Sequence, residues 1–183
     1  MAIIGIGGLG MLGVQYAKAM GMKVIAIDNR QEGIDLANSV PSHLRPDQTF
    51  LIDSEDAKKK CSEELSNGFY DSNPGVDRVV ITTEQQELPA FASACTRKGG
   101  VLVGVGLPSD NKLVISPFDL SFKELTLRGR LICTPEETKS MLDLHAKNGC
   151  KTHVEKTYPL EKINDLIEHY KSSSLKGRLC VTF

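Results

Sequence analysis

The chain has 183 residues and a formal net charge of −1, with 40% hydrophobic and 25% charged residues. These values are typical of a soluble globular protein with one good-sized core, and they argue against nucleic acid or an anionic membrane as a partner. No apolar run is long enough to span a bilayer. The five cysteines are scattered without a C-x-x-C pair, which predicts reduced thiols and a cytoplasmic location.

Short β-branched runs alternate with helical patterns over the first 131 residues. The β-branched runs predict strands over residues 2–6, 23–28, 48–52, 76–83, 101–106 and 124–132. The helical patterns predict helices over residues 8–20 and 54–68, and a third from Leu88 to a stop at Gly99 and Gly100. This alternation predicts an α/β fold: a doubly wound, parallel six-stranded sheet with helices on both faces.

The segment from residue 132 onward begins with a strong helix signal. Thr134 is a good N-cap residue, Pro135 fits the first helical position, and Glu137 completes a capping box. The helix is predicted to run to about Asn148 and Gly149.

Further elements of this segment are a strand over residues 152–158, a helix over residues 163–170 and a closing strand over residues 178–183. Their order does not continue the βαβ rhythm. We therefore predict a main domain at residues 1–131 and a C-terminal α+β appendage at residues 132–183. We expect the apolar side of the appendage to be covered by self-association or by packing onto the main domain.

The sequence "GIGGLG" lies between the first predicted strand and the first predicted helix. Its Gly5, Gly7 and Gly10 fit the pattern G-x-G-x-x-G, in which the glycines allow a tight turn, close approach of a pyrophosphate and close helix packing. The helix begins near Gly8 and Leu9, where its amide groups and dipole favour a phosphate. The pattern therefore predicts a Rossmann dinucleotide-binding domain, although a glycine-rich structural turn is the alternative.

Asp28 supports the dinucleotide interpretation. It stands at the end of the second predicted strand, where a carboxylate accepts hydrogen bonds from the hydroxyls of the adenosine ribose. A carboxylate at this position repels a 2′-phosphate, so NAD is favoured over NADP. Asn29 and Arg30 belong to the same candidate site, and Arg30 leaves NADP as the less favoured alternative because it could reach a phosphate.

Several separate blocks of the sequence carry a resemblance to a known family. They are "GIGGLGMLGVQYAKAMGMKVIAID", "VDRVVITT", "KGGVLVGVGLP", "KELTLRGR", "YPLEKIND" and "LKGRLCVTF". In their order and spacing, the chain resembles the cofactor-binding half of the zinc-type medium-chain alcohol dehydrogenases, which include the cinnamyl and sinapyl alcohol dehydrogenases. The resemblance covers essentially the whole chain.

The resemblance implies further cofactor contacts. Thr82 and Thr83 would lie beside a ribose of the cofactor, and Arg178 would reach back to the pyrophosphate. The nicotinamide would lie against an apolar group formed by Val103, Gly104, Val105, Leu131 and Ile132. Each residue also has a simpler interpretation, as a buried strand residue or a solvated charge.

The resemblance also implies what this chain lacks. In the family, the zinc ligands, the proton-relay hydroxyl and most of the substrate pocket lie in a domain that precedes this region. His145, Cys150 and His153 match no zinc spacing, so we expect no zinc and no catalytic residue in this chain alone. Tyr158 and Lys162 fit the Y-x-x-x-K of short-chain dehydrogenases, but Pro159 directly after the tyrosine excludes a shared helical turn.

The favoured function is therefore the NAD-binding portion of an alcohol dehydrogenase-like oxidoreductase. The intact enzyme would transfer hydride between the nicotinamide and a primary alcohol or aldehyde. The alternatives are a stand-alone NAD-binding module without catalysis and a module that dimerises through the predicted edge strand at residues 123–131, as the family does. A zinc-free quinone reductase is a further alternative, although that type prefers NADPH.

Overall fold

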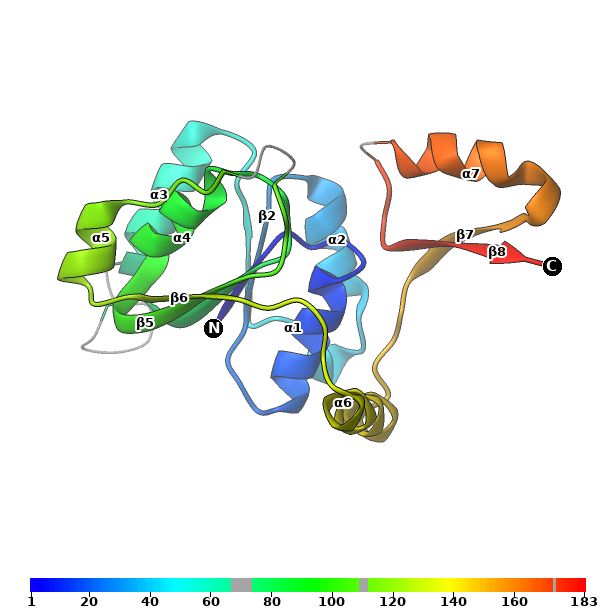
Figure 1. Cartoon of the computed structure of the whole chain (residues 1–183), viewed down its shortest axis with the longest axis horizontal. Coiled ribbons are helices and arrows are strands. Elements are labelled where there is room, and N and C mark those ends of the chain that lie inside the picture. Colours follow the sequence, from blue (N-terminus) through cyan, green and yellow to red (C-terminus); the bar gives the residue numbers. More distant parts are fainter. Residues whose placement is uncertain (67–73, 109–111, 173) are drawn as a thin grey trace.

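The structure is a computed structural model that describes residues 1–66, 74–108, 112–172 and 174–183 (Figure 1). Its strands are β1 (Ala2–Ile4), β2 (Ile25–Asp28), β3 (Gln48–Leu51), β4 (Val76–Ile81), β5 (Thr96–Gly104), β6 (Thr126–Gly129), β7 (Val154–Pro159) and β8 (Arg178–Thr182). Its α-helices are α1 (Gly10–Ala19), α2 (Gln31–Ser39), α3 (Glu55–Ser66), α4 (Leu88–Cys95), α5 (Pro117–Phe122), α6 (Pro135–Asn148) and α7 (Ile163–Tyr170). Short 3₁₀ turns are η1 (Ser42–Leu44) and η2 (Leu160–Lys162).

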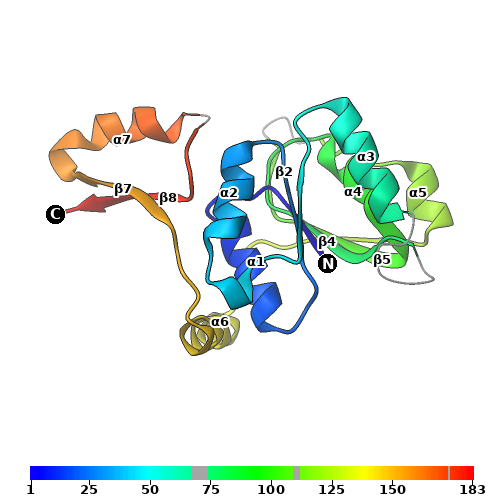
Figure 2. The ribbon, with the colours of Figure 1, turned by 180° about the vertical axis from the view of Figure 1, so that it is seen from behind.

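The main sheet has the strand order β3-β2-β1-β4-β5-β6, and every neighbouring pair is parallel. This is the doubly wound order of a Rossmann fold, which confirms the predicted fold class. Helices α1 and α2 cover one face of the sheet, and α3, α4 and α5 cover the other (Figures 1 and 2).

The period of two along the strands divides the core between these faces. On β1, Ala2 and Ile4 pack in the cluster that includes α3 and α4, whereas Ile3 packs in the cluster that includes α1 and α2. Because both faces of β1 are buried, the strand needs apolar residues at every position, as the run "AII" supplies.

The sequence did not predict two helices, α2 and α5. Helix α2 has the poor helix former Gly33 in its first turn, although Ile34, Leu36 and Ala37 bury one side of the helix. Helix α5 begins after the N-cap Ser116, whose hydroxyl accepts a hydrogen bond from the N–H group of Asp119 at 3.1 Å. That Ser-Pro start was a recognisable signal.

The predicted stop of the third helix at Gly99 and Gly100 is wrong. Helix α4 ends at Cys95, and β5 begins at once with Thr96, which pairs with Val76 of β4. The two glycines lie in an irregularity of β5, where Gly99 has a φ of 72° and its N–H group donates to the carbonyl oxygen of Lys123 at 2.7 Å. Strand pairing with a distant segment therefore ends the helix early.

The appendage contains the predicted helices and strands, but their arrangement differs from the prediction. The capping box of α6 is present, with Thr134 as N-cap and Gly149 in the left-handed C-cap conformation. However, β7 and β8 are parallel and are connected through α7, so they form a small βαβ unit with its own two-stranded sheet. The expectation that the appendage departs from the βαβ pattern is therefore wrong for this unit.

Tyr158 lies in β7 and Lys162 lies in η2, so this pair shares no helical turn.

Gln15 of α1 anchors the appendage to the main domain. Its side chain is fully buried, its Nε2 atom donates to the carbonyl oxygen of Lys151 at 2.8 Å, and its Oε1 atom accepts from the Lys151 N–H group at 2.8 Å. Nearby, the Tyr16 hydroxyl lies 3.0 Å from Nδ1 of His145, and burial raises the pKa of Tyr16. The βαβ unit itself stands away from the sheet (Figures 1 and 2), and Val154 and Ile167 remain 42% and 43% exposed.

We predict that Gln15→Leu destabilises the protein by about 2 kcal/mol, because two backbone groups of Lys151 lose their partner. Urea unfolding followed by circular dichroism measures this change. Gln31→Leu is the matched control, because the Gln31 side chain is exposed and bonds to Asp35 on the same helix, and it should stay within about 0.5 kcal/mol of wild type. Equal stabilities of the two variants would contradict the role of Gln15 in attaching the appendage to the main domain.

Candidate functional site

A cavity of about 380 Å³ lies at the carboxyl ends of β1, β2 and β4. The strand order reverses between β1 and β4, and ligands of open α/β sheets bind at such a switch point. Several predicted cofactor residues line this cavity: Gly5, Gly7, Asp28, Asn29, Arg30, Thr82 and Thr83. The topology therefore brings together three stretches of sequence that the prediction treated separately.

The three glycines of the turn have distinct spatial roles. Gly5 has a φ of 92°, which side-chain-bearing residues rarely adopt, and its N–H group donates to the carbonyl oxygen of Ile27 at 2.9 Å. A Cβ atom on Gly10 would lie 2.0 Å from the carbonyl oxygen of Gly5, so only glycine lets α1 pack this closely on the turn. A Cβ atom on Gly7 would meet nothing within 4 Å, so Gly7 faces open space at the cavity.

The start of α1 presents backbone donors to the same place. The N–H group of Met11 donates to the carbonyl oxygen of Gly7 at 3.0 Å, so the amide groups of Gly8, Leu9 and Gly10 belong to the first, unsatisfied part of the helix. No acidic side chain lies in the first turn of α1, which is fully described. The dipole of α1 therefore makes this end of the cavity attractive to an anion.

Asp28 closes the other side of the cavity. Asp28 is 4% exposed, its Oδ2 atom accepts from the Ile6 N–H group at 2.5 Å, and its Oδ1 atom accepts from the Arg30 N–H group at 2.8 Å. The Nε atom of Arg30 lies 3.5 Å from Oδ1. These bonds hold the carboxylate in one orientation and join the end of β2 to the glycine turn.

Thr82 fixes the far wall. Its N–H group donates to the carbonyl oxygen of Ile4 at 2.9 Å, and its hydroxyl donates to the carbonyl oxygen of Gly5 at 2.5 Å. Thr83 packs against Gly5, since a Cβ atom there would lie 3.0 Å from that of Thr83. Both threonines therefore shape the glycine turn as well as the cavity.

The predicted nicotinamide residues lie further along the sheet. Val103 and Gly104 end β5, and the N–H group of Val105 donates to the carbonyl oxygen of Ile81 at 2.9 Å. Leu131 and Ile132 follow β6 and are 76% and 77% exposed. The structure therefore places this apolar group at the carboxyl ends of β5 and β6, beside the cavity end of β4.

Arg178 lies directly on the glycine turn, although it is far away in sequence. A Cβ atom on Gly8 would lie 2.5 Å from Nε and 2.7 Å from Cδ of Arg178. The N–H group of Arg178 donates to the carbonyl oxygen of His153 at 2.9 Å, which sets the start of β8. This cation is therefore next to the donor-rich start of α1.

Sequence reasoning missed part of the cavity wall. Ile52 and Leu88 contribute apolar surface, and Glu84 and Gln85 line the rim. The signal for the last two was their position three and four residues after the end of β4, because residues that follow parallel strands gather at the carboxyl edge.

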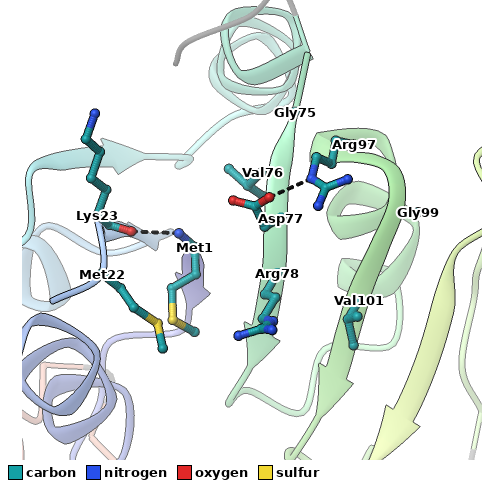
Figure 3. A pocket seen from close by; sticks show the side chains of 10 residues that line it. All are labelled: Met1, Met22, Lys23, Gly75, Val76, Asp77, Arg78, Arg97, Gly99 and Val101. Carbon is teal, nitrogen blue, oxygen red and sulfur yellow. Dashed lines mark hydrogen bonds and ion pairs between the residues drawn. The ribbon is translucent and has the colours of Figure 1, made fainter. Parts of the chain in front are cut away.

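A larger cavity of about 770 Å³ lies at the opposite, amino-terminal edge of the sheet (Figure 3). Its polar groups bond mainly to one another: Nε of Arg97 donates to Asp77 at 2.6 Å, and the Met1 amino group donates to the carbonyl oxygen of Lys23 at 2.6 Å. The hydrogen bond from Arg97 lowers the pKa of Asp77. Because ligands of such sheets bind at the carboxyl edge, the smaller cavity is the candidate site.

In the part of the chain that the structure describes, no three His, Cys, Asp or Glu side chains come together as metal ligands would. His145 bonds to Tyr16 on α1, Cys150 is buried in the core, and the carbonyl group of His153 bonds to Arg178. These residues do not fit a zinc site.

Within the same described residues, no helix combines the length and apolar character needed to cross a membrane.

The fold and the glycine turn define a Rossmann-type domain of a dehydrogenase. The sequence model of the zinc-binding dehydrogenases matches residues 8–147, so the chain belongs to this family. This confirms the resemblance stated above.

Relatives and solved structures agree with this assignment. An alcohol dehydrogenase of Geobacillus stearothermophilus is 33% identical over 179 residues, which cover 98% of this chain and 49% of that protein. Acetophenone reductase from Geotrichum candidum in complex with NAD superposes with a TM-score of 0.77 at 26% identity, covering 100% of this chain and 48% of that one. A putative zinc-binding dehydrogenase from Sinorhizobium meliloti bound to NADP gives a TM-score of 0.81 at 25% identity, covering 100% and 52%. The chain thus spans about half the length of the relatives it matches.

We predict that alanine at two glycines of the turn changes the stability by very different amounts. Gly10→Ala should destabilise the protein by about 3 kcal/mol, because its Cβ atom would overlap the carbonyl oxygen of Gly5. Gly7→Ala should stay within about 0.5 kcal/mol, because its Cβ atom enters open space. Urea unfolding of both variants checks this, and a stable Gly10→Ala variant would contradict the close approach of α1.

Proposed function

We propose that this chain is the NAD(H)-binding portion of an alcohol dehydrogenase-like oxidoreductase. The observation that carries the proposal is the open space over Gly7, which lies between the unsatisfied amide groups of α1 and the carboxylate of Asp28. That arrangement offers donors for a pyrophosphate and an acceptor for ribose hydroxyls at the two ends of one cavity. The residues present therefore fit a nicotinamide dinucleotide.

The proposed contacts follow the cavity from one end to the other. The amide groups of Gly8, Leu9 and Gly10 bind the pyrophosphate, and Arg178 adds a positive charge beside them. Asp28 and Asn29 bind the adenosine ribose. Thr82 and Thr83 lie near the second ribose. The apolar residues at the ends of β5 and β6 receive the nicotinamide: Val103, Gly104, Val105 and Ile132.

NAD is the preferred dinucleotide in this proposal. The solved relatives include one in complex with NAD and one bound to NADP, so the preference rests on this chain's own charges. Asp28 and Glu84 bring two carboxylates to the cavity, and Arg30 brings a cation whose Nε already lies 3.5 Å from Asp28. A 2′-phosphate would face the carboxylate of Asp28 directly, and the pairing of Arg30 with that carboxylate leaves the cation less able to bind the phosphate.

When bound, the nicotinamide supplies the hydride donor or acceptor. In the intact enzyme, the substrate of that transfer is a primary alcohol or aldehyde. This chain positions the cofactor, and we propose that it binds NAD(H) without turnover by itself, because no metal-binding cluster occurs among its described residues. The cytoplasm, with its reduced thiols, is the proposed location.

We further propose a homodimer through the β6 edge. All residues of β6 are exposed. The Arg130 N–H group donates to Gly104 at 3.2 Å, so alternation in a parallel ladder directs the backbone groups of Leu127 outward. An unpaired edge of this kind is a template for a second strand. The stacked rings of Phe118 and Phe122 on α5 are 66% and 67% exposed and add apolar surface for association.

We predict that the wild-type chain enhances NADH fluorescence in a saturable titration and that Asp28→Ala weakens NADH binding about tenfold, through loss of charge-assisted hydrogen bonds to ribose. NADPH should bind more weakly than NADH to the wild type. Asp56→Ala, which removes an exposed carboxylate on α3, is the control and should bind NADH normally. Tighter binding of NADPH, or an Asp28→Ala variant with unchanged affinity, would contradict the NAD preference, and no binding of either dinucleotide would overturn the proposed function.

We predict a dimeric mass for the wild type in light scattering and a monomeric mass for Leu127→Pro. Proline removes an outward N–H group of the edge strand and leaves the pairing of β6 with β5 in place. Leu142→Lys changes an apolar residue of α6 that is 57% exposed, and it should remain dimeric. A monomeric wild type would refute the interface.

A further inference from the structure

Gly33 occupies the first turn of α2, where its backbone does not require glycine. Its φ is not among the positive values found in this chain, and its N–H group donates to the carbonyl oxygen of Arg30 at 3.1 Å as in a helical turn. Glycine is a poor helix former, so alanine would be the better residue on backbone grounds alone. The reason for glycine must therefore lie in the space around it.

That space is occupied by Asp28. A Cβ atom on Gly33 would lie 2.3 Å from Cγ, 2.5 Å from Oδ2 and 2.8 Å from Oδ1 of Asp28. These distances are far inside van der Waals contact, and both groups are buried, so a side chain at residue 33 and this carboxylate position exclude each other.

The position that Gly33 makes available is the one in which Asp28 bonds to the glycine turn. Oδ2 reaches the Ile6 N–H group at 2.5 Å, and Oδ1 reaches the Arg30 N–H group at 2.8 Å. A carboxylate displaced by a methyl group would lose at least the bond to Ile6. It would then no longer be held beside the turn in a fixed orientation.

We propose that Gly33 is a positioning residue that sets dinucleotide selectivity by making room for the Asp28 carboxylate. The inference rests on the proposed function, because it assigns Gly33 to the ribose end of the same cavity. Gly33 contacts no part of the cofactor in this proposal. It acts through Asp28 alone.

A double-mutant cycle tests this coupling. Gly33→Ala should weaken NADH binding about tenfold and NADPH binding less, so that the ratio of the two dissociation constants falls. In an Asp28→Ala background, Gly33→Ala should change neither dissociation constant, because the group it displaces is gone. The same loss in both backgrounds, or no loss in either, would overturn the proposal.

Thermal unfolding without ligand supplies a second reading of the cycle. In the Asp28→Ala background, Gly33→Ala should raise Tm by about 2–4 °C, because alanine favours the helix. In the wild-type background that gain should be absent or reversed. Equal changes of Tm in the two backgrounds would overturn the steric coupling. The comparison of Tm values tests the steric coupling even if the wild type binds neither NADH nor NADPH. That outcome would overturn the proposed function but not the coupling.

Discussion

The close approach of Gly10 to the carbonyl oxygen of Gly5 is the constraint on which the site depends. It brings the first turn of α1 against the end of β1, so that the amide groups of the helix point across the carboxyl edge of the sheet. Asp28 and Thr82 then reinforce the same turn from both neighbouring strands, through the N–H group of Ile6 and the carbonyl oxygen of Gly5. Three strands thus converge on one short backbone segment. The absence of a Cβ atom at Gly5 and at Gly10 therefore determines where the start of α1 lies and where an anion can bind.

The charged groups that line the two cavities explain why the smaller cavity is the candidate site. At the amino-terminal edge, Asp77 and Arg97 neutralise each other, and this hydrogen bond holds the pKa of the Asp77 carboxyl below its usual range. At the carboxyl edge, the start of α1 offers N–H groups without partners in the helix, and the carboxylate of Asp28 stands at the end of the neighbouring strand β2. Separated charges of opposite sign suit a ligand that has a phosphate group at one place and hydroxyl groups at another. The chemistry of the lining, and not the volume, distinguishes the sites.

Sequence reasoning predicted the elements whose signals are local. The capping box around Thr134 and the glycine turn each depend on residues within a few positions, and the structure contains both. It failed where a distant partner decides. Thr96 begins a strand because it pairs with Val76, and no pattern around Thr96 reveals that partner.

The candidate site shows the same division. The position of Asp28 at the end of a strand was readable from the sequence, but its bond to Ile6 and the space it takes over Gly33 were not, because they depend on side-chain rotation in the folded core. Glu84 was readable in principle, since it lies three residues after the end of β4. The family resemblance implied that Arg178 would reach back to the pyrophosphate, but its closeness to Gly8 was not readable from the sequence, because these residues are separated by almost the entire chain.

Arg178 also links the appendage to the candidate site. Gly177, with a φ of 75°, lets the chain turn tightly past His153, and a Cβ atom there would lie 2.5 Å from the His153 carbonyl oxygen. That turn delivers Arg178 to the glycine turn, while Gln15 holds the other end of the appendage at Lys151. In the small βαβ unit, Ile163 and Ile167 of α7 are 37% and 43% exposed. The appendage is therefore attached to the main domain at two places, and one of these attachments brings a cation to the glycine turn.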